Sequence, residues 1–191
     1  VNQYESEAIL EMLLKKGYTK EHDFKQADII LINSCTVTNE SDKKIKKFLH
    51  RVRRENPNAI IVLTGCMTQA ASLEDLSLID ADIILGNTER KLIPEIILEF
   101  IENKEKIIKI NPYKSSTKFE DLQIDNFDER TRAFVKIEDG CNRFCSYCII
   151  PYARGRVRSK PLEDLINESK KLALAGYKEI VLIGINLSAY G

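Results

Sequence analysis

The chain has 191 residues, enough for one large domain or for one domain and part of a second. Its hydrophobic fraction of 43% is ordinary for a globular protein, and no apolar run approaches the roughly 18 residues of a membrane span. Five cysteines, an odd number, without a secretory signal argue against a disulfide scaffold and indicate a reducing compartment. We therefore expect a soluble, cytoplasmic protein with no membrane partner.

The charges cancel overall, with 29 basic and 29 acidic residues, but they are separated along the chain. Residues 41–55 carry seven Lys and Arg against two acids, residues 130–160 carry eight against two, and residues 120–129 carry five acids and no base. Blocks of one sign indicate a polyanionic partner for the basic parts. For residues 41–55 alone, a solvated helix face is the favoured alternative.

The first part of the chain alternates short apolar runs with helical patterns. Strands are predicted at residues 27–33, 59–65, 81–87 and 106–110, and helices at residues 5–16, 39–55 and 92–103. The alternation predicts a parallel, Rossmann-like α/β sheet, and the nearly continuous apolar strands indicate cover on both faces. We expect residues 1–110 to form this domain with its first strand missing, because a helix begins at once after Val1.

Cys35 and Cys66 each follow a predicted strand. The carboxyl ends of parallel strands lie along one edge of a sheet, where ligands bind. Two ordinary buried cysteines are the alternative, since this residue is often buried. Their equivalent positions in two strand–loop–helix units favour a shared metal site, with a third ligand from the end of the missing strand.

Residues 111–131 are polar, contain Pro112 and show neither period, which predicts a linker. Residues 132–191 then form a second unit. Its first strand, 133–140, runs directly into a cysteine-rich loop, a helix follows from Pro161 to Gly176, and a strand is predicted at 179–184. This βαβ pattern builds (β/α) barrels, whose chemistry lies at the carboxyl ends of strands. Two strands cannot close a barrel, so we expect an incomplete one.

Cys141, Cys145 and Cys148 form a CxxxCxxC triplet in that loop. Three thiolates can hold three irons of a 4Fe–4S cluster and leave the fourth iron open to a small molecule, whereas electron-transfer clusters usually have four cysteine ligands. Zinc prefers a closed set of four ligands, usually as two separated pairs, and both His22 and His50 lie far upstream. An iron–sulfur site is favoured; zinc and unliganded thiols remain the alternatives.

The triplet, with Tyr147 just before its third cysteine, resembles the signature of the radical S-adenosylmethionine (SAM) superfamily. The resemblance implies that the amino and carboxylate groups of SAM chelate the open iron. One electron, delivered by a donor such as flavodoxin or ferredoxin, then cleaves SAM to a 5′-deoxyadenosyl radical.

The whole chain resembles the radical-SAM methylthiotransferases. The matching motifs, in order, are VNQYESE, NSCTVTNESD, TGCMTQ, CNRFCSYC, YARGRVRS and LIGINLSAYG. The family has an N-terminal cluster domain, a radical-SAM barrel and usually an RNA-binding TRAM domain, and its first cluster cysteine would lie two residues before Val1. VNQYESE and CTVTNESD look most like the branch that acts on threonylcarbamoyl-adenosine beside the tRNA anticodon.

This resemblance implies two 4Fe–4S clusters with divided roles. Cys141, Cys145 and Cys148 would hold the SAM cluster, whose radical removes the hydrogen at position 2 of the adenine ring. Cys35 and Cys66, with the third cysteine, would hold an auxiliary cluster that carries the sulfur or methylthio group. A second SAM supplies the methyl group.

Further residues are predicted to bind the cofactor or the substrate. Tyr147 is expected near the adenine of SAM, and Gly184 and Asn186 where the last strand meets SAM. Arg154, Arg156 and Arg158 alternate, so in an extended segment they would face one side and suit a phosphate or a substrate carboxylate. The alternative for Tyr147 is an aromatic side chain packed within the loop. For Gly184 and Asn186 it is an ordinary strand-to-loop turn, and for the three arginines it is a solvated loop.

Other functions remain open at this stage. One alternative is a methylthiotransferase that modifies another tRNA adenosine or a ribosomal-protein aspartate. Another is an iron–sulfur electron carrier, which would have a fully ligated cluster and would not cleave SAM. A zinc-stabilised binding module is a further alternative. Because the first cluster ligand and most of the barrel are missing, activity is expected of the whole protein rather than of this chain alone.

Overall fold

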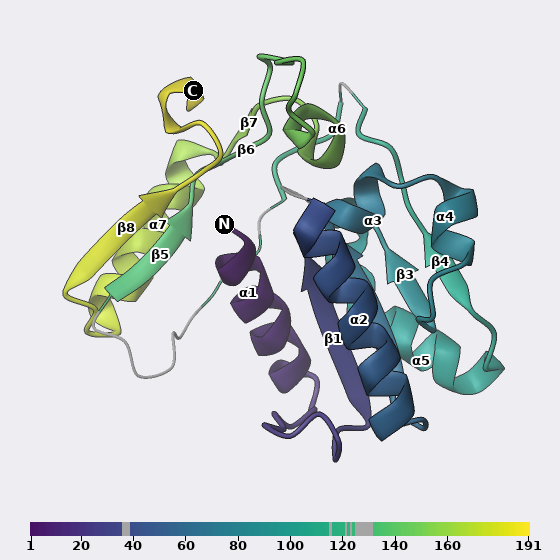
Figure 1. Cartoon of the computed structure of the whole chain (residues 1–191). Coiled ribbons are helices and arrows are strands. Elements are labelled where there is room, and N and C mark those ends of the chain that lie inside the picture. Colours follow the sequence, from purple (N-terminus) through teal and green to yellow (C-terminus); the bar gives the residue numbers. More distant parts are fainter. Residues whose placement is uncertain (36–38, 115, 121, 123, 125–131) are drawn as a thin grey trace. The chain divides into compact units, whose positions relative to one another are not determined.

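The structure, a computed structural model, describes every residue except 36–38, 115, 121, 123 and 125–131. The chain forms two compact units (Figure 1). We call Asn2 with Met12–Pro112 the sheet unit, and Val1, Gln3–Glu11 and Tyr113–Gly191 the Cys-loop unit. Helix α1 (Asn2–Lys15) contributes to both. The predicted division into 1–110, 111–131 and 132–191 stays a prediction, because much of the linker lies outside the described residues.

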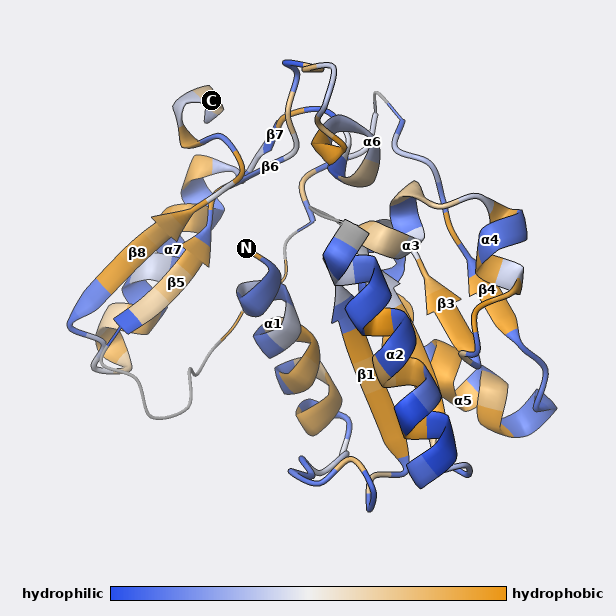
Figure 2. Ribbon diagram, viewed as in Figure 1, coloured by the Kyte–Doolittle hydropathy of each residue, from blue (hydrophilic) through white to orange (hydrophobic). Residues whose placement is uncertain are grey.

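The sheet unit contains a four-stranded sheet in the order β1-β2-β3-β4, with every neighbouring pair parallel. The strands are β1 (Ile29–Ser34), β2 (Ile60–Gly65), β3 (Ile83–Leu85) and β4 (Ile107–Lys109). The predicted parallel α/β sheet is confirmed. Figure 2 shows these strands as apolar along almost their whole length, as expected where both faces are covered.

The helices of this unit follow the strands in sequence. They are α2 (Asn39–Glu55), α3 (Cys66–Ala70), α4 (Leu73–Ser77), the 3-10 helix η1 (Asn87–Leu92) and α5 (Ile93–Asn103). Sequence periodicity found α2 and α5 but missed α3, α4 and η1, because one or two turns are too short to show a period. Among the described residues, no helix is both long enough and apolar enough to cross a membrane.

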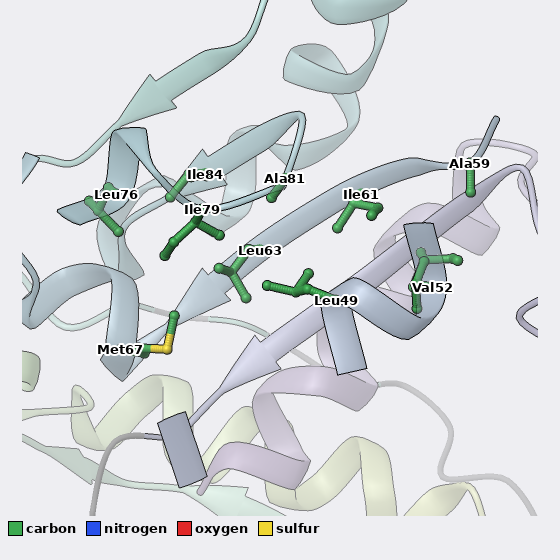
Figure 3. Close-up of a cluster of buried hydrophobic side chains, with 11 residues drawn as sticks. Leu49, Val52, Ala59, Ile61, Leu63, Met67, Leu76, Ile79, Ala81 and Ile84 are labelled. Atoms are coloured by element: carbon green, nitrogen blue, oxygen red, sulfur yellow. The ribbon is translucent and has the colours of Figure 1, made fainter. Parts of the chain in front are cut away.

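One face of the sheet builds the larger core (Figure 3). Leu49 and Val52 of α2 point toward Ile61 and Leu63 of β2, and all four side chains are buried. Register explains the cluster, since Ile61 pairs with Ile30 of β1 and therefore lies on the same face. Each such side chain contributes about 1.5–3 kcal/mol on burial. This core fixes the strands whose ends carry Cys35 and Cys66.

The Cys-loop unit is built around a parallel strand pair. β5 (Arg132–Lys136) pairs with β8 (Glu179–Ile183), and α7 (Leu162–Leu174) lies between them in sequence, which confirms the βαβ pattern. Two strands of two residues each, β6 (Glu138–Asp139) and β7 (Arg158–Ser159), pair antiparallel. The remaining elements are α6 (Ile150–Arg154) and the 3-10 helix η2 (Leu187–Ala189). The described strands close no barrel.

The second core differs from the sequence expectation in two ways. Tyr4 and Ala8 of α1 pack with Ala133 and Val135 of β5, so the first helix serves this unit as well. The helical period of the sequence predicts an inner face of α7 made of Leu162, Leu165, Ile166, Leu172 and Ala173. Of these, Leu172 is buried and Leu165 packs against the core, whereas the other three are exposed. The reason is that α7 covers only two strands, so only a narrow stripe of it is enclosed.

Candidate metal centre

The cysteine triplet occupies the loop between β6 and α6. Cys145 is exposed, and Cys141 and Cys148 are partly exposed; all three are free thiols. The Cys141 N–H donates to the Gly155 carbonyl at 3.1 Å, which ties the start of the loop to the residue after α6. The Cys148 N–H donates to the Cys145 carbonyl at 2.9 Å, so the last two cysteines lie in one turn.

Aromatic and cationic side chains of this loop, of α6 and of the segment after it contact one another. Phe144 has a positive φ of 47°, and its ring meets that of Tyr152 edge-to-face at a centroid distance of 5.9 Å. The guanidinium of Arg156 lies 5.2 Å from the Phe144 ring centroid. Tyr147 is 91% exposed, so its ring is open to a ligand. Its predicted place near the adenine of SAM stays a prediction.

The donor chemistry of the loop fits an iron–sulfur cluster. Three soft thiol ligands with access to solvent lie within eight residues, and no disulfide consumes them. Among the described residues, no three His, Cys, Asp or Glu side chains are gathered closely enough to hold a metal ion. The thiols fit by type, number and access but are not gathered around one point in this structure, and the ligand roles of Cys141, Cys145 and Cys148 stay predictions.

Buried Glu138 connects the loop to the predicted cofactor residues. Its Oε2 accepts a hydrogen bond from the Asn186 N–H at 2.7 Å, while Oε1 has no hydrogen-bond partner among the described residues. A Cβ added at Gly184 would lie 2.8 Å from Glu138 Oε2, so a glycine lets this turn approach the carboxylate. Burial raises the pKa of Glu138, and the N–H groups of Asn186 and Ile185 oppose that shift. The cofactor roles of Gly184 and Asn186 stay predictions.

The three arginines do not lie in one extended segment, since Arg154 ends α6 and Arg158 begins β7, so the condition under which they would face one side is not met. Arg154 ends α6 and is buried, with Nη1 2.8 Å from Glu5 Oε1 and 3.1 Å from Asp139 Oδ1. Arg158 donates to the Arg154 carbonyl at 2.8 Å, and its guanidinium lies 4.5 Å from the ring centroid of Tyr113. Only Arg156 is exposed. Its role in substrate binding, and that of Arg158, stays a prediction, whereas the side chain of Arg154 is occupied by two carboxylates.

In the sheet unit, Cys35 and Cys66 follow neighbouring strand ends. Ser34 ends β1 and Gly65 ends β2, and these two residues are register partners. The residue that follows each strand is the cysteine, so both lie at the carboxyl edge of adjacent parallel strands, as the sequence predicted. Cys66 is buried and Cys35 is partly exposed. Their role as metal ligands stays a prediction.

Ser34 and Gly65 lock these two strand ends together. The Ser34 hydroxyl donates to the Thr64 carbonyl at 2.6 Å and accepts from the Met67 N–H at 3.2 Å. Gly65 has a φ of +112°, and a Cβ there would lie 2.3 Å from the Ser34 carbonyl oxygen. The backbone can therefore turn from β2 into α3, and deliver Cys66, only with glycine at this position.

Sequence reasoning missed several polar residues along the same edge. Gln69 accepts a hydrogen bond from the Asn87 N–H at 2.7 Å and donates to the Asn111 carbonyl at 3.0 Å. Glu89 Oε1 accepts from Asn111 Nδ2 at 2.6 Å. A signal was present, since Asn87 and Asn111 each come two residues after a strand. Sequence reasoning also missed Glu138 and the cluster of Glu5, Lys136 and Asp139, because a separation of 131 residues between Glu5 and Lys136 gives no indication that they meet.

Two family descriptions match separate parts of the chain. "Uncharacterized protein family UPF0004" matches residues 1–86, and the "Radical SAM superfamily" matches residues 135–190. The first stretch contains Cys35 and Cys66, and the second contains Cys141, Cys145 and Cys148. The two cysteine sets therefore fall within two different family matches.

Curated relatives match the chain from end to end. It is 41% identical to "Threonylcarbamoyladenosine tRNA methylthiotransferase MtaB" of Bacillus subtilis and 42% identical to the protein of that name from Thermotoga maritima, over 100% of this chain and 42% and 43% of those proteins. A "tRNA-2-methylthio-N(6)-dimethylallyladenosine synthase" of Pelagibacter ubique is 35% identical, over 100% of this chain and 44% of that protein. The chain thus spans less than half the length of these relatives.

A solved structure shares the fold at low sequence identity. The radical S-adenosylmethionine methyltransferase TsrM of Kitasatospora setae, with tryptophan and a SAM analogue bound, aligns with a TM-score of 0.61 and 13% identity. The alignment covers 97% of this chain and 45% of that one. This similarity shows a shared α/β fold.

Proposed function

The chain resembles the radical-SAM methylthiotransferases along its entire length, and we propose that its protein adds a methylthio group to position 2 of threonylcarbamoyl-adenosine beside the tRNA anticodon. The relatives named for this reaction are 37–42% identical to the chain. Those named for the dimethylallyladenosine reaction are 35–37% identical. The proposal therefore prefers the first tRNA substrate, and the second is the main alternative.

The arrangement of the five cysteines carries this proposal. Cys35 and Cys66 stand at neighbouring strand ends of one unit, and three further cysteines share a single loop of the other. A sulfur-inserting enzyme that uses SAM needs two sites, one to generate the radical and one to supply sulfur. We therefore assign one 4Fe–4S cluster to each cysteine set, and the first set needs a third ligand in addition to Cys35 and Cys66.

The residues around the loop have distinct tasks in this proposal. The cluster held by Cys141, Cys145 and Cys148 supplies, when bound, the electron that cleaves SAM. Glu138 keeps the Gly184–Asn186 turn close to the loop through the Asn186 N–H. Tyr147, which is almost fully exposed, is free to lie against the adenine of SAM. An electron donor such as flavodoxin or ferredoxin belongs to the proposal as well.

Helix α2 offers a surface suited to tRNA. Its side chains of Lys43, Lys44, Lys46 and Lys47 are exposed, and Figure 2 shows the helix as strongly hydrophilic on the side in view. Like charges three and four residues apart destabilise a helix, so this grouping has a cost that an anionic partner offsets. A tRNA substrate also implies a cytoplasmic location.

The test is a product assay on the full-length protein. The protein is reconstituted anaerobically with iron and sulfide and incubated with SAM, a reductant and tRNA that carries threonylcarbamoyl-adenosine without the methylthio group. Mass spectrometry of the nucleosides should show the methylthio product, and the Cys145→Ala variant should not form it. Methylthio gain only on dimethylallyl-adenosine or on a ribosomal protein would contradict the substrate, and absence of SAM cleavage would favour an electron carrier.

A further inference from the structure

Four buried charged side chains meet in the Cys-loop unit. Glu5 of α1, Lys136 of β5, Asp139 of β6 and Arg154 of α6 each have side chains at most 5% exposed. Lys136 Nζ lies 2.8 Å from both Glu5 Oε1 and Asp139 Oδ2. Arg154 binds Glu5 with two nitrogens, Nη1 at 2.8 Å and Nη2 at 3.0 Å, and its Nη1 is 3.1 Å from Asp139 Oδ1. Arg158 Nη2 also lies 3.6 Å from Asp139 Oδ2, so the two carboxylates face three cations, of which Lys136 and Arg154 are the closer ones.

This buried ion cluster holds both ends of the cysteine loop. Asp139 lies two residues before Cys141, and its Oδ1 accepts from the Gly140 N–H at 2.9 Å. Arg154 lies six residues after Cys148, at the end of α6. The two loop ends also meet through the backbone, since a Cβ at Gly140 would lie 2.2 Å from the Arg156 carbonyl oxygen. The cluster therefore forms the base from which the three thiols project.

Glu5 is the member that comes from a distant part of the chain. Its partners lie 131 and 149 residues away in sequence, and its carboxylate is the only group of the four on α1. Glu5 and Asp139 together engage Arg154, and a guanidinium held by two carboxylates loses its freedom to rotate. Without Glu5, Lys136 and Arg154 would each lose a carboxylate 2.8 Å away, and their buried positive charge would be less well compensated.

General stability explains this arrangement poorly. Burying an ion cluster costs desolvation that apolar residues of similar volume avoid, so such clusters are weak sources of stability. What they do provide is a unique geometry. Groups that orient metal ligands through such contacts typically change metal affinity when they are removed.

We propose that Glu5 is a positioning residue for the Cys141–Cys148 loop, and that its carboxylate fixes Arg154 and Lys136 so that the three thiols can bind one iron–sulfur cluster. The proposal rests on the iron–sulfur function proposed above. It gives the VNQYESE motif, which the sequence analysis placed in the cluster domain, a role at the SAM cluster. It also gives Arg154 a role other than substrate binding.

The test uses the full-length protein with Cys35→Ala and Cys66→Ala, so that bound iron reports on the loop alone. After anaerobic reconstitution, iron release to a chelator is followed in this parent and in the Glu5→Gln variant. The proposal predicts release about 10-fold faster or more in Glu5→Gln, together with an altered EPR response of the cluster to SAM. Glu163→Gln, which removes an exposed carboxylate from α7 of the same unit, should behave as the parent does.

A charge-balanced variant separates positioning from folding. Glu5→Gln with Arg154→Gln removes one charge of each sign, so its melting temperature should recover relative to Glu5→Gln. The proposal predicts that this double variant still loses iron quickly, because the ion pairs between Glu5 and Arg154 that hold the ends of the loop are absent. Recovery of iron retention together with the melting temperature, or parent-like retention in Glu5→Gln, would overturn it. A parent that binds no iron would contradict the proposed function and this proposal with it.

Discussion

The two cysteine sites are held in place by different physical means. At the sheet edge, Cys35 and Cys66 depend on backbone geometry and on short neutral side chains, chiefly Gly65 and Ser34. At the loop, Cys141–Cys148 depends on buried charges from three separate parts of the chain. The sheet edge should therefore be sensitive to added volume and lost hydrogen bonds, whereas the loop should be sensitive to lost charge and to pH.

Adding a methyl group at Gly65 should produce the largest loss of stability. Gly65→Ala places a Cβ 2.3 Å from the Ser34 carbonyl oxygen and also strains a backbone with φ +112°. We expect a cost of about 3 kcal/mol or more in the free energy of unfolding, measured with urea. Gly17→Ala is the matched control, because Gly17 has φ +91° but no atom within 4 Å of an added Cβ. Equal costs for the two variants would show that the close approach to Ser34 is unimportant.

Removing the Ser34 hydroxyl should have a smaller effect at the same edge. Ser34→Ala leaves the Thr64 carbonyl and the Met67 N–H without this partner in a buried place. We expect a loss of about 1–3 kcal/mol in the free energy of unfolding. Ser77→Ala serves as the control and should cost less, because the Ser77 hydroxyl donates to the Glu74 carbonyl in an exposed part of α4.

Glu138 should make the stability of the Cys-loop unit depend on pH. Burial raises its pKa, so in the carboxyl range the folded protein keeps a proton that the unfolded chain releases. The contribution of Glu138 to stability should therefore fall as pH rises from its ordinary pKa through the raised one. Asp139 adds to the upward shift and Arg158 opposes it. In Glu138→Gln this fall should vanish from urea unfolding curves recorded between about pH 4 and pH 7; an unchanged pH profile would contradict the assignment.

The exposed lysines of α2 should affect tRNA binding and leave stability almost unchanged. In the full-length protein, Lys43→Gln with Lys47→Gln should weaken tRNA binding at low salt and reduce the salt dependence by roughly 0.7–0.9 for each phosphate contact removed. Lys170→Gln with Lys171→Gln, an equal change of charge on α7, is the control. The measurement is a tRNA-binding titration at several salt concentrations. Equal tRNA affinities of the α2 and α7 double variants would indicate that the α2 lysines are only solvated and do not contact tRNA.

Local patterns predicted the sheet and the position of every cysteine. Strand and helix periods located β1 to β4, α2 and α5, and parallel strand ends brought Cys35 and Cys66 to one edge. Contacts between distant residues left no such pattern. Glu5 reads as an ordinary helix acid, and Lys136 and Asp139 as strand-end charges, until folding buries them together. The alternating arginines likewise give no sign that α6 ends at Arg154 and takes this residue out of an extended segment.

The central claim, that the two cysteine sets hold separate clusters, is tested most directly by counting iron. The full-length protein, its Cys35→Ala/Cys66→Ala variant and its Cys145→Ala variant are reconstituted anaerobically, and iron and sulfide are measured per chain. The account predicts about eight irons in the first and about four in each variant, since each cubane holds four. Iron that is unchanged by Cys35→Ala/Cys66→Ala would contradict it and make these two cysteines structural residues of the sheet edge.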